Sequence, residues 1–382
     1  MRFSIVGCGF VADYYMTTLE NHRSLKLAGV YDVDAQRLAQ FSQHYRVHAA
    51  SSLEEVLLEP SIEAVAVLTT PETHFEIAKS ALEAGKHVYC EKPLALDMKD
   101  AEQLVALAKQ KGLVLGGAPA NRFSDAFGAT RKLIERGDIG APKLVYAEME
   151  DGPVFRDNWQ TWRSVSGAPW PGKHEFEIGC TLEHAGYALS WLIELFGPIE
   201  TITGTSGTFF LDKGIEIAPK AMAPDFSAAC LTFQSGVVAR LTNGLCAPKD
   251  RSLTIMGERG TITVDDLWDN RSPIHMSVKG QVPSFGFRVV RRLEAMLGRV
   301  LPVKFNEGRR IRYKSSGEKS LPKFPSQIDF CAGIAAVAQA MDDGDMREAL
   351  GLRALHVTEA ALALNRISDH GGKYKMKSTV AA

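Results

Sequence analysis

The sequence predicts an α/β domain with a parallel Rossmann sheet, followed by an α+β domain built on a large, mostly antiparallel open sheet. Over residues 1–120, short apolar runs alternate with helical stretches, a pattern typical of parallel βαβ units. A glycine-rich turn follows the first of these runs. After residue 143, strand-like stretches follow one another with few long helices between them. We therefore expect two domains, over residues 1–120 and 121–382.

The composition is that of an ordinary globular protein. The 382 residues are 45% hydrophobic and 23% charged, enough for two domains with sizeable cores. The net charge of −1 gives no reason to expect nucleic acid as a partner. No apolar run approaches the ~20 residues of a membrane span, and Met1-Arg2 leads into a strand without a secretory leader. The six scattered cysteines and ten histidines lack metal-ligand spacing, so we expect a cytoplasmic protein with buried thiols and no metal.

Five apolar runs in the first domain have the length and composition of buried strands. They are Phe3–Val6, Leu25–Tyr31, Ala64–Leu68, His87–Cys90 and Leu113–Gly116. Helical stretches separate them, and the one after the fourth strand begins at an N-cap residue, Asp97, and ends at Gly112. This alternation predicts a parallel sheet with helices on both faces.

The first turn, Gly7-Cys8-Gly9-Phe10-Val11-Ala12, matches the G-x-G-x-x-A pattern of dinucleotide-binding sites. Gly7 permits a tight turn, Gly9 allows a diphosphate to approach the backbone, and Ala12 allows helix and strand to pack closely. The diphosphate would lie at the N-terminus of the following helix, where unpaired amides favour anions. The motif is weak when alone, but a strand precedes it and a helix follows.

Asp32, at the end of the second strand, stands where a carboxylate accepts hydrogen bonds from the adenosine ribose. Asp34 lies close by, and two carboxylates would repel a 2'-phosphate. We therefore expect NAD rather than NADP. Arg37 leaves the alternative open, because one arginine can bind a phosphate.

The third strand ends in Thr69-Thr70-Pro71-Glu72-Thr73-His74. The threonine hydroxyls and the proline turn suit contact with a cofactor ribose. They are equally a routine helix start, with Thr70 as N-cap and Pro71 at the first helical position. We expect His74 to have a structural role next to the cofactor rather than a catalytic one.

The fourth strand ends in Glu91-Lys92-Pro93. Lys92 lies at the carboxyl end of a sheet strand, where open α/β sheets bind ligands, and the following proline restrains it. The alternative is an ordinary surface lysine in a strand-to-helix loop.

The chain resembles the glucose–fructose oxidoreductase / inositol dehydrogenase family through an ordered set of motifs. These are the glycine turn, Asp32, Thr70-Pro71 with His74, Glu91-Lys92-Pro93 and Asn121-Arg122-Phe123. The resemblance implies that Lys92 is catalytic and that Glu91 holds the nicotinamide ribose. It also implies a Rossmann domain followed by a domain with a large, mostly antiparallel sheet. With the residues above, Phe10, Val11 and Arg122 complete the expected cofactor contacts.

The second domain is predicted to consist mainly of strands, with one hairpin turning at residues 257–260. One helix, from Thr181 to Phe196, interrupts them and ends at Gly197-Pro198. Glu183 and Tyr187 lie opposite its apolar stripe and face either solvent or the nicotinamide cleft.

This helix departs from the commoner family motif, D-x-G-x-H, whose histidine is the acid/base residue. Glu183 stands at the aspartate position and Tyr187 at the histidine position, a tyrosine also found in sugar oxidoreductases of the family. His184 is directed about 100° away from Glu183 around the helix and is the weaker candidate. Lowering a tyrosine pKa from about 10 to 7 needs ~4 kcal/mol, and an ammonium group ~5 Å away supplies roughly 3 kcal/mol. We therefore expect a catalytic pair, Lys92 and Tyr187, in which Lys92 lowers the tyrosine pKa.

The segment between the domains places tryptophans beside charged residues, a combination that suits sugars. Arg163, Lys173 and His174 are candidates for substrate contact, together with Lys92, Glu183, His184 and Tyr187. An ordinary loop packed by its tryptophans is the equal alternative.

A basic segment, residues 287–314, carries nine arginine and lysine residues and two glutamates. Its apolar residues form a helical stripe that suits packing on its own sheet or on another subunit. The sharper alternative is contact with an anionic partner, such as a nucleotide-sugar phosphate or a membrane surface.

The sequence thus predicts an NAD-dependent oxidoreductase that acts on a sugar, nucleotide sugar or cyclic polyol. We expect it to form a homo-oligomer, a dimer or tetramer, through the second-domain sheet. Two alternatives remain on the same scaffold: an NAD-binding regulator without activity, and an NAD-dependent glycosidase without net redox change.

Overall fold

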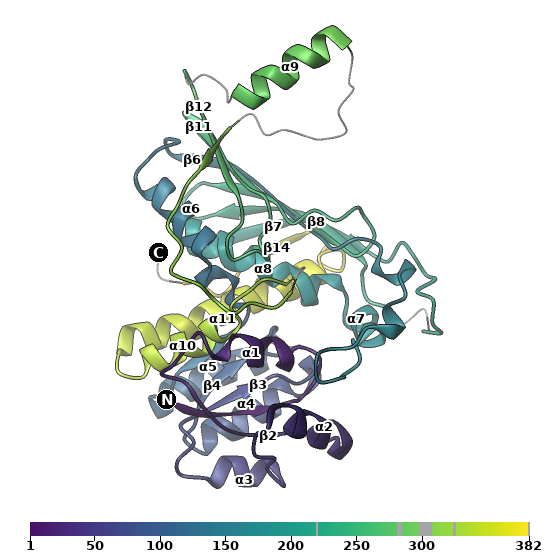
Figure 1. The fold of residues 1–382 in the computed structure, drawn as a ribbon, viewed down its shortest axis with the longest axis vertical. Helices are drawn as coiled ribbons and strands as arrows, with labels where there is room; N and C mark the ends of the chain where they lie inside the picture. Colours follow the sequence, from purple (N-terminus) through teal and green to yellow (C-terminus); the bar gives the residue numbers. More distant parts are fainter. Residues whose placement is uncertain (219–220, 281–284, 298–307, 324–325, 381–382) are drawn as a thin grey trace.

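The computed structural model describes residues 1–218, 221–280, 285–297, 308–323 and 326–380, and forms two sheets with helices between and around them (Figure 1). The first sheet is parallel, with strand order β2-β1-β3-β4-β5. Its strands are β1 (Arg2–Val6), β2 (Lys26–Tyr31), β3 (Ala64–Val67), β4 (His87–Cys90) and β5 (Leu115–Gly117). Its helices are α1 (Ala12–Leu19), α2 (Ala35–Tyr45), α3 (Leu53–Leu58), α4 (Pro71–Glu83) and α5 (Met98–Lys111).

Helices α4 and α5 begin where the sequence predicts, and α2 begins at a capping aspartate that was not predicted. The Asp34 side chain accepts hydrogen bonds from the first amides of α2, and the Asp97 side chain caps α5 in the same way. Helix α4 starts with Pro71 at its first position, and α5 ends at Gly112 in a left-handed conformation. Local sequence signals therefore set the helix ends that surround the expected cofactor site.

The second sheet has nine strands in the order β13-β12-β11-β10-β6-β9-β8-β7-β14. The central pair, β6 and β9, is parallel, and the other neighbouring pairs are antiparallel. The strands are β6 (Pro142–Glu150), β7 (Ile199–Gly207), β8 (Phe226–Phe233), β9 (Val238–Gly244), β10 (Leu253–Gly257), β11 (Gly260–Val264), β12 (Ile274–Val278), β13 (Arg309–Ile311) and β14 (Lys373–Lys375). The Rossmann sheet followed by a large, mostly antiparallel sheet confirms the predicted fold class, and the β10–β11 hairpin is confirmed as well.

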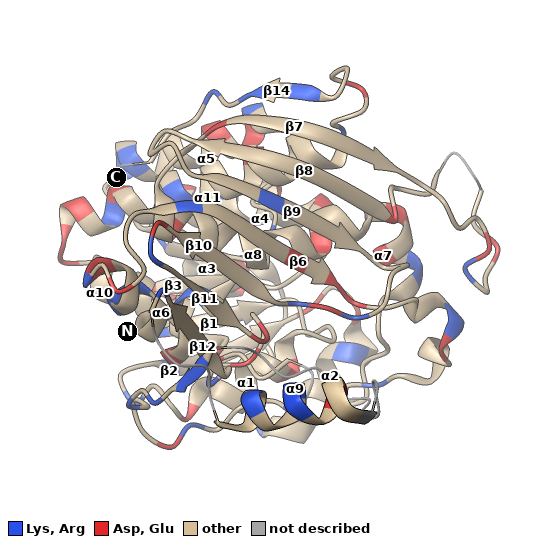
Figure 2. Cartoon of the chain, turned by 90° about the horizontal axis from the view of Figure 1, so that it is seen from above, with Lys and Arg blue, Asp and Glu red and all other residues tan. Residues whose placement is uncertain are grey.

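One face of the second sheet is covered by helices and the other is not. Helices of the second domain are α6 (Asp125–Glu135), α7 (Gly172–Ile178), α8 (Cys180–Phe196), α9 (Phe285–Leu297), α10 (Cys331–Ala340) and α11 (Gly344–Asn365), with short 3₁₀ turns at Ala120–Phe123, Val154–Arg156 and Trp159–Thr161. Helices α8 and α11 pack on the inner face. Figure 2 looks onto the outer face, over which no described helix lies. Leu144 and Tyr146 are 45% and 42% exposed there.

Two long helices late in the chain, α10 and α11, were not predicted. They return to the first domain and pack on β4 and β5. Glycines make this contact possible: a Cβ at Gly116 would lie 2.7 Å from Val337, and one at Gly117 would lie 2.6 Å from Ala354. The proposed division at residue 120 falls just after β5. Helix α11, from the C-terminal part of the chain, contacts β5 of the first sheet and β7 of the second.

Among the described helices, none combines the length and apolar composition needed to span a bilayer. Helix α9 stands apart from the body, beyond the β11–β12 end of the second sheet (Figure 1).

Candidate active site

The turn between β1 and α1 leaves its backbone accessible at one point only. Gly7 has a φ of +102°, and a Cβ there would lie 2.6 Å from the backbone of Leu68. A Cβ at Gly9 would meet no atom within 4 Å. Beyond it, Phe10 and Val11 are half-buried, Ala12 is buried, and no side chain caps α1. An open glycine beside the uncapped N-terminus of a helix fits the diphosphate of a dinucleotide.

Asp32 follows β2 and is buried, with 6% of its surface exposed. Its carboxylate accepts hydrogen bonds from the amides of Cys8 and Asp34, both at 2.8 Å. Arg37 forms ion pairs with both aspartates, 3.5 Å from Asp32 and 3.2 Å from Asp34. The carboxylate is therefore held by the glycine turn itself, in the place where a ribose hydroxyl would bind.

A loop of the second domain lies over this edge of the first domain. The Asp13 carboxylate, at the start of α1, accepts hydrogen bonds from the amide and the hydroxyl of Ser166, at 3.0 and 2.8 Å. Tyr45 donates a third hydrogen bond to Asp13, and Gly167 lies against Gln40 so closely that a Cβ would be 2.3 Å from its side chain. No sequence motif points to Asp13, because its partner lies 153 residues away.

The loops after β3 and β4 are tied together by His74. Its imidazole is fully buried, with Nδ1 2.7 Å from the carbonyl oxygen of Pro93 and Nε2 3.1 Å from that of Thr69. The Thr69 hydroxyl accepts a hydrogen bond from Thr73, while Thr70 and Pro71 begin α4. His74 therefore orients the two loops that flank Lys92.

Glu91 and Lys92 are held by different partners. One oxygen of Glu91 accepts a hydrogen bond from the Tyr15 hydroxyl at 2.6 Å, and the other from the Lys92 amide at 3.1 Å. The Lys92 ammonium group lies 2.5 Å from the Glu183 carboxylate on α8. Burial opposes the charge on Lys92, but Glu183 and the other acidic groups around it together outweigh burial, and the pKa of Lys92 is raised. Burial also opposes charge on Glu183, yet Lys92 lowers its pKa below the usual range.

Tyr187 lies one turn further along α8 than Glu183, with the Lys92 ammonium 5.9 Å from its ring centre. The ring is 8% exposed, and its hydroxyl has no hydrogen-bond partner within the described residues. Burial raises the pKa of Tyr187 and exceeds the opposing effect of Lys92. The expectation that Lys92 brings this pKa toward neutrality is therefore wrong for the protein alone, because burial outweighs the effect of the ammonium group and the carboxylates of Glu91 and Glu183 also oppose ionisation.

Trp268 packs against the side chains of both Tyr187 and His184. Its ring contacts those of Tyr187 and His184, at centroid distances of 4.8 and 5.6 Å. His184 lies 3.0 Å from the Glu175 carboxylate on α7. Burial disfavours the imidazolium, but Glu175 more than compensates, and the pKa of His184 is raised. Because His184 is three positions before Tyr187, the two side chains are neighbours on the helix surface. The side chain of His184 still points about 100° away from that of Glu183 around the helix.

Several buried polar atoms here are still unpaired. Among the described residues, Nδ1 of His184 and Nε1 of Trp268 have no hydrogen-bond partner. Glu150, at the end of β6, is 4% exposed, and burial raises its pKa to about 7. Such groups usually bind a polar ligand or ordered water. Neither Trp268 nor Glu150 was among the predicted site residues, since an isolated tryptophan or glutamate on a strand carries no motif.

The remaining candidates have partners of their own. Arg163 donates to the carbonyl oxygens of Gln160 and Trp162 in its own loop. Lys173 lies 3.7 Å from Glu177, one turn along α7. His174 reaches across to Glu72 on α4, at 2.8 Å. The structure does not bring Arg163 or Lys173 to Lys92.

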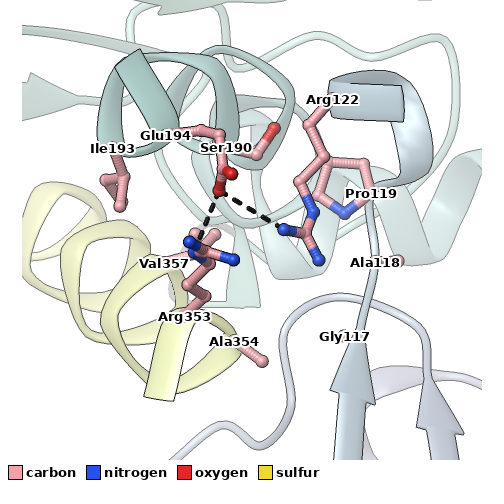
Figure 3. Close-up of a pocket in the computed structure, with 10 residues that line it drawn as sticks. All are labelled: Gly117, Ala118, Pro119, Arg122, Ser190, Ile193, Glu194, Arg353, Ala354 and Val357. Carbon is pink, nitrogen blue, oxygen red and sulfur yellow. Dashed lines mark hydrogen bonds and ion pairs between the residues drawn. The ribbon is translucent and has the colours of Figure 1, made fainter. Parts of the chain in front are cut away.

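Arg122 is directed at α8. Its guanidinium lies 3.4 Å from Glu194, which also binds Arg353 of α11 at 2.9 Å (Figure 3). The three side chains line a small pocket with Pro119 and Ser190. The second half of the α8 polar face therefore binds arginines of neighbouring elements and is not exposed to solvent.

Comparisons with known proteins agree with this arrangement. Residues 1–117 match the model "Oxidoreductase family, NAD-binding Rossmann fold", and residues 127–263 match "GFO/IDH/MocA C-terminal domain". The chain is similar to scyllo-inositol 2-dehydrogenase (NADP(+)) IolU of Bacillus subtilis and to myo-inositol 2-dehydrogenase of Thermotoga maritima. Each is 26% identical, over 70% of this chain and 76% of the relative.

Solved structures share the fold. The WlbA dehydrogenase of Bordetella pertussis, in complex with NADH and UDP-GlcNAcA, has a TM-score of 0.69 and 20% identity, over 99% of this chain and 98% of that one. Aldose-aldose oxidoreductase of Caulobacter crescentus has a TM-score of 0.72 and 18% identity, over 98% and 99%. With both domains matched in order, the chain belongs to the GFO/IDH/MocA family of oxidoreductases.

Proposed function

We propose that this protein transfers a hydride between NAD and a hydroxyl or carbonyl carbon of a sugar, nucleotide sugar or cyclic polyol. The observation that carries the proposal is the half-buried Lys92–Glu183 pair beside the Tyr187 ring, at the carboxyl end of β4. Relatives named for inositols, and a neighbour bound to a nucleotide sugar, support the substrate class.

The cofactor side suits a dinucleotide. Gly7 and Gly9 would hold its diphosphate, Asp32 the adenosine ribose, and Thr69, Thr70 and Glu91 the nicotinamide half. When bound, the nicotinamide supplies the hydride acceptor or donor. We propose NAD, because a 2'-phosphate would meet two carboxylates whose arginine, Arg37, is already paired with both. One inositol dehydrogenase relative is named for NADP(+), so titration with both coenzymes is the direct test.

Lys92 would donate a hydrogen bond to the reacting oxygen of the substrate. An ammonium group has three donors, and Glu183 accepts only one of them. Glu183 keeps Lys92 charged and fixed in direction, so little reorganisation is needed when negative charge develops on that oxygen.

Tyr187 would exchange the proton of the same oxygen. Its raised pKa keeps the hydroxyl protonated at neutral pH, which suits a donor to a substrate carbonyl. In the oxidative direction the Lys92 ammonium near the ring favours the tyrosinate that forms. Its hydroxyl has no other partner in the described protein and is free to face the substrate.

The His184–Glu175 pair is the second candidate for this proton transfer. Glu175 raises the histidine pKa, and the unpaired Nδ1 offers a second hydrogen-bonding position. The contact of both rings with Trp268 places the two candidates side by side.

The decisive experiment follows NADH absorbance while sugars, inositols and nucleotide sugars are screened with NAD and NADP. For an active substrate, we expect Lys92→Met to lower kcat/KM at least about 100-fold, because a charge-assisted hydrogen bond to the reacting oxygen is lost. Lys109→Met is the matched control, since Lys109 also forms an ion pair between the domains, with Glu348 at 2.6 Å, but far from the cofactor turn. Full activity of Lys92→Met would refute the mechanism.

The same screen separates the two alternative functions. A regulator would bind the dinucleotide, but no sugar would change the absorbance. An NAD-dependent glycosidase would release the leaving group from aryl glycosides without net formation of NADH.

The uncovered sheet face supports a homo-oligomer, a dimer or tetramer, because Leu144 and Tyr146 would otherwise remain in water. Four of the six cysteines are free and buried, namely Cys8, Cys90, Cys180 and Cys331. We propose a cytoplasmic location, since free thiols persist in reducing compartments.

A further inference from the structure

Helix α9 presents an apolar stripe to solvent. Phe285, Val289, Leu293 and Met296 are 75%, 39%, 43% and 73% exposed. At 100° per residue these four side chains fall within an arc of about 80°. The half-buried residues Phe287, Val290 and Glu294 lie on another side of the helix, so the stripe is not the face turned toward the body.

Arginines border this stripe. Arg288, Arg291 and Arg292 are exposed, and Arg288 lies over the Phe285 ring at 5.9 Å. Figure 2 shows these positive positions on α9. The edge strand β13 and the residues after it add four more exposed cations, Arg309 and Arg310 in the strand and Arg312 and Lys314 beyond it. Over the described residues 285–297 and 308–314, seven arginine and lysine residues are therefore accompanied by a single acid, Glu294. Arg299, Lys304 and Glu307 of the basic segment lie outside the described residues.

We propose that α9 attaches this protein to the surface of an anionic membrane. The stripe would enter the boundary between headgroups and acyl chains, while the arginines bind lipid phosphates in the plane of the interface. The four cations of residues 309–314 would add attraction within about a Debye length of the surface. Because the overall charge is only −1, the attraction comes from this cluster of cations and not from the net charge of the chain.

A second copy of the chain suits this face less well. If two stripes met around a two-fold axis, Arg288 and Arg292 of each copy would approach those of the other. Interfaces between copies are depleted of charge at their centre, and like charges oppose pairing. A bilayer offers the opposite charge in the same plane as the apolar region.

The test is vesicle flotation with the full-length protein. We expect it to float with vesicles of phosphatidylcholine containing about one third phosphatidylglycerol, but not with pure phosphatidylcholine. About 0.5 M salt should release it, since the Debye length then falls below about 5 Å.

Two double variants separate the contributions. Arg288→Ala with Arg292→Ala should weaken partition into the anionic vesicles roughly 30-fold. Leu293→Glu with Met296→Glu should abolish flotation, because charged residues cannot enter the acyl boundary. Leu58→Glu is the control: Leu58 is 77% exposed on the first domain and should have no effect. Circular dichroism melts confirm that each variant is folded.

Failure of the wild-type protein to float with anionic vesicles would overturn the proposal, as would equal flotation of the arginine variant. A lower molar mass of the Leu293/Met296 variant in light scattering, without vesicle binding by the wild type, would assign the stripe to a second copy. None of these readouts depends on oxidoreductase activity.

Discussion

The ammonium group of Lys92 forms an ion pair with a carboxylate, that of Glu183, and not with Tyr187, its expected partner. Its ammonium group is 2.5 Å from Glu183 and 5.9 Å from the centre of the Tyr187 ring. A cation with an anion at hydrogen-bond distance has less effect on a third group, because the pair is nearly neutral when seen from outside. This is why burial dominates the pKa of Tyr187.

Substitution of Tyr187 and His184 should identify the group that exchanges the proton. We expect Tyr187→Phe to lower kcat between about 10²- and 10⁴-fold, since general acid–base catalysis contributes that much. His184→Asn should affect KM more than kcat, because the substrate loses a binding partner rather than its proton donor. The reverse pattern, with the pH dependence of kcat lost only in His184→Asn, would assign the proton to the histidine.

Glu150 should make stability depend on pH. Burial raises its folded-state pKa from 4.5 to about 7, so the native state binds the proton more tightly than the unfolded chain. Above pH 7 the native state therefore carries a buried, charged carboxylate. The free energy of unfolding of the wild type, relative to a variant without this group, falls as pH rises from 4.5 to 7. Glu150→Gln should therefore melt at a higher temperature than wild type at pH 8, with a smaller difference at pH 5. Glu200→Gln, on the exposed side of β7, should show no such trend in a thermal melt.

At the scale of the elements, the two halves of the polar face of α8 contact different parts of the protein. Its first turns carry Glu183 and Tyr187 toward Lys92, and its last turns carry Ser190 and Glu194 toward Asn121 and the arginines. A helical wheel shows one polar stripe and cannot reveal that two different domains contact its two halves.

The glycines of β5 should be required for the contact between the domains. Gly117→Ala would place a methyl group 2.6 Å from the Cβ of Ala354, so we expect a loss of about 1–3 kcal/mol in the free energy of unfolding. Gly128→Ala in α6 is the control, because no atom lies within 4 Å of its Cβ and alanine favours the helix by about 1 kcal/mol. Chemical denaturation of both variants measures the difference. Equal stability of Gly117→Ala and wild type would show that α11 can move away from β5.

At the scale of the whole molecule, the outer face of the second sheet should hold the subunits together. Introducing charge there, with Leu144→Glu and Tyr146→Glu, should lower the molar mass to that of one chain, 41.8 kDa, in light scattering. A double substitution of exposed residues in α3, Leu58→Glu and Glu54→Lys, serves as control. A wild-type protein that already has the mass of one chain would contradict the proposed oligomer.

Much of the first domain was predictable because its signals are local. Strand, glycine turn, helix and Asp32 lie within the first 32 residues, and α2 and α5 each start at a capping aspartate. The family motifs added the second-domain fold, which the nine-stranded sheet confirms. The C-terminal helices α10 and α11 were missed, since their alanine-rich, largely buried sequences lack a clear amphipathic pattern.

The sequence by itself determined the Rossmann scaffold, the dinucleotide turn with Asp32, and the position of Lys92 at a strand end. Only the tertiary structure decided which group faces Lys92, that His184 and Tyr187 share the Trp268 ring, and that Asp13 binds Ser166. The physical reason is distance along the chain. Neighbours in sequence are constrained by backbone geometry, whereas Lys92 and Glu183, 91 residues apart, meet only when the two domains pack together.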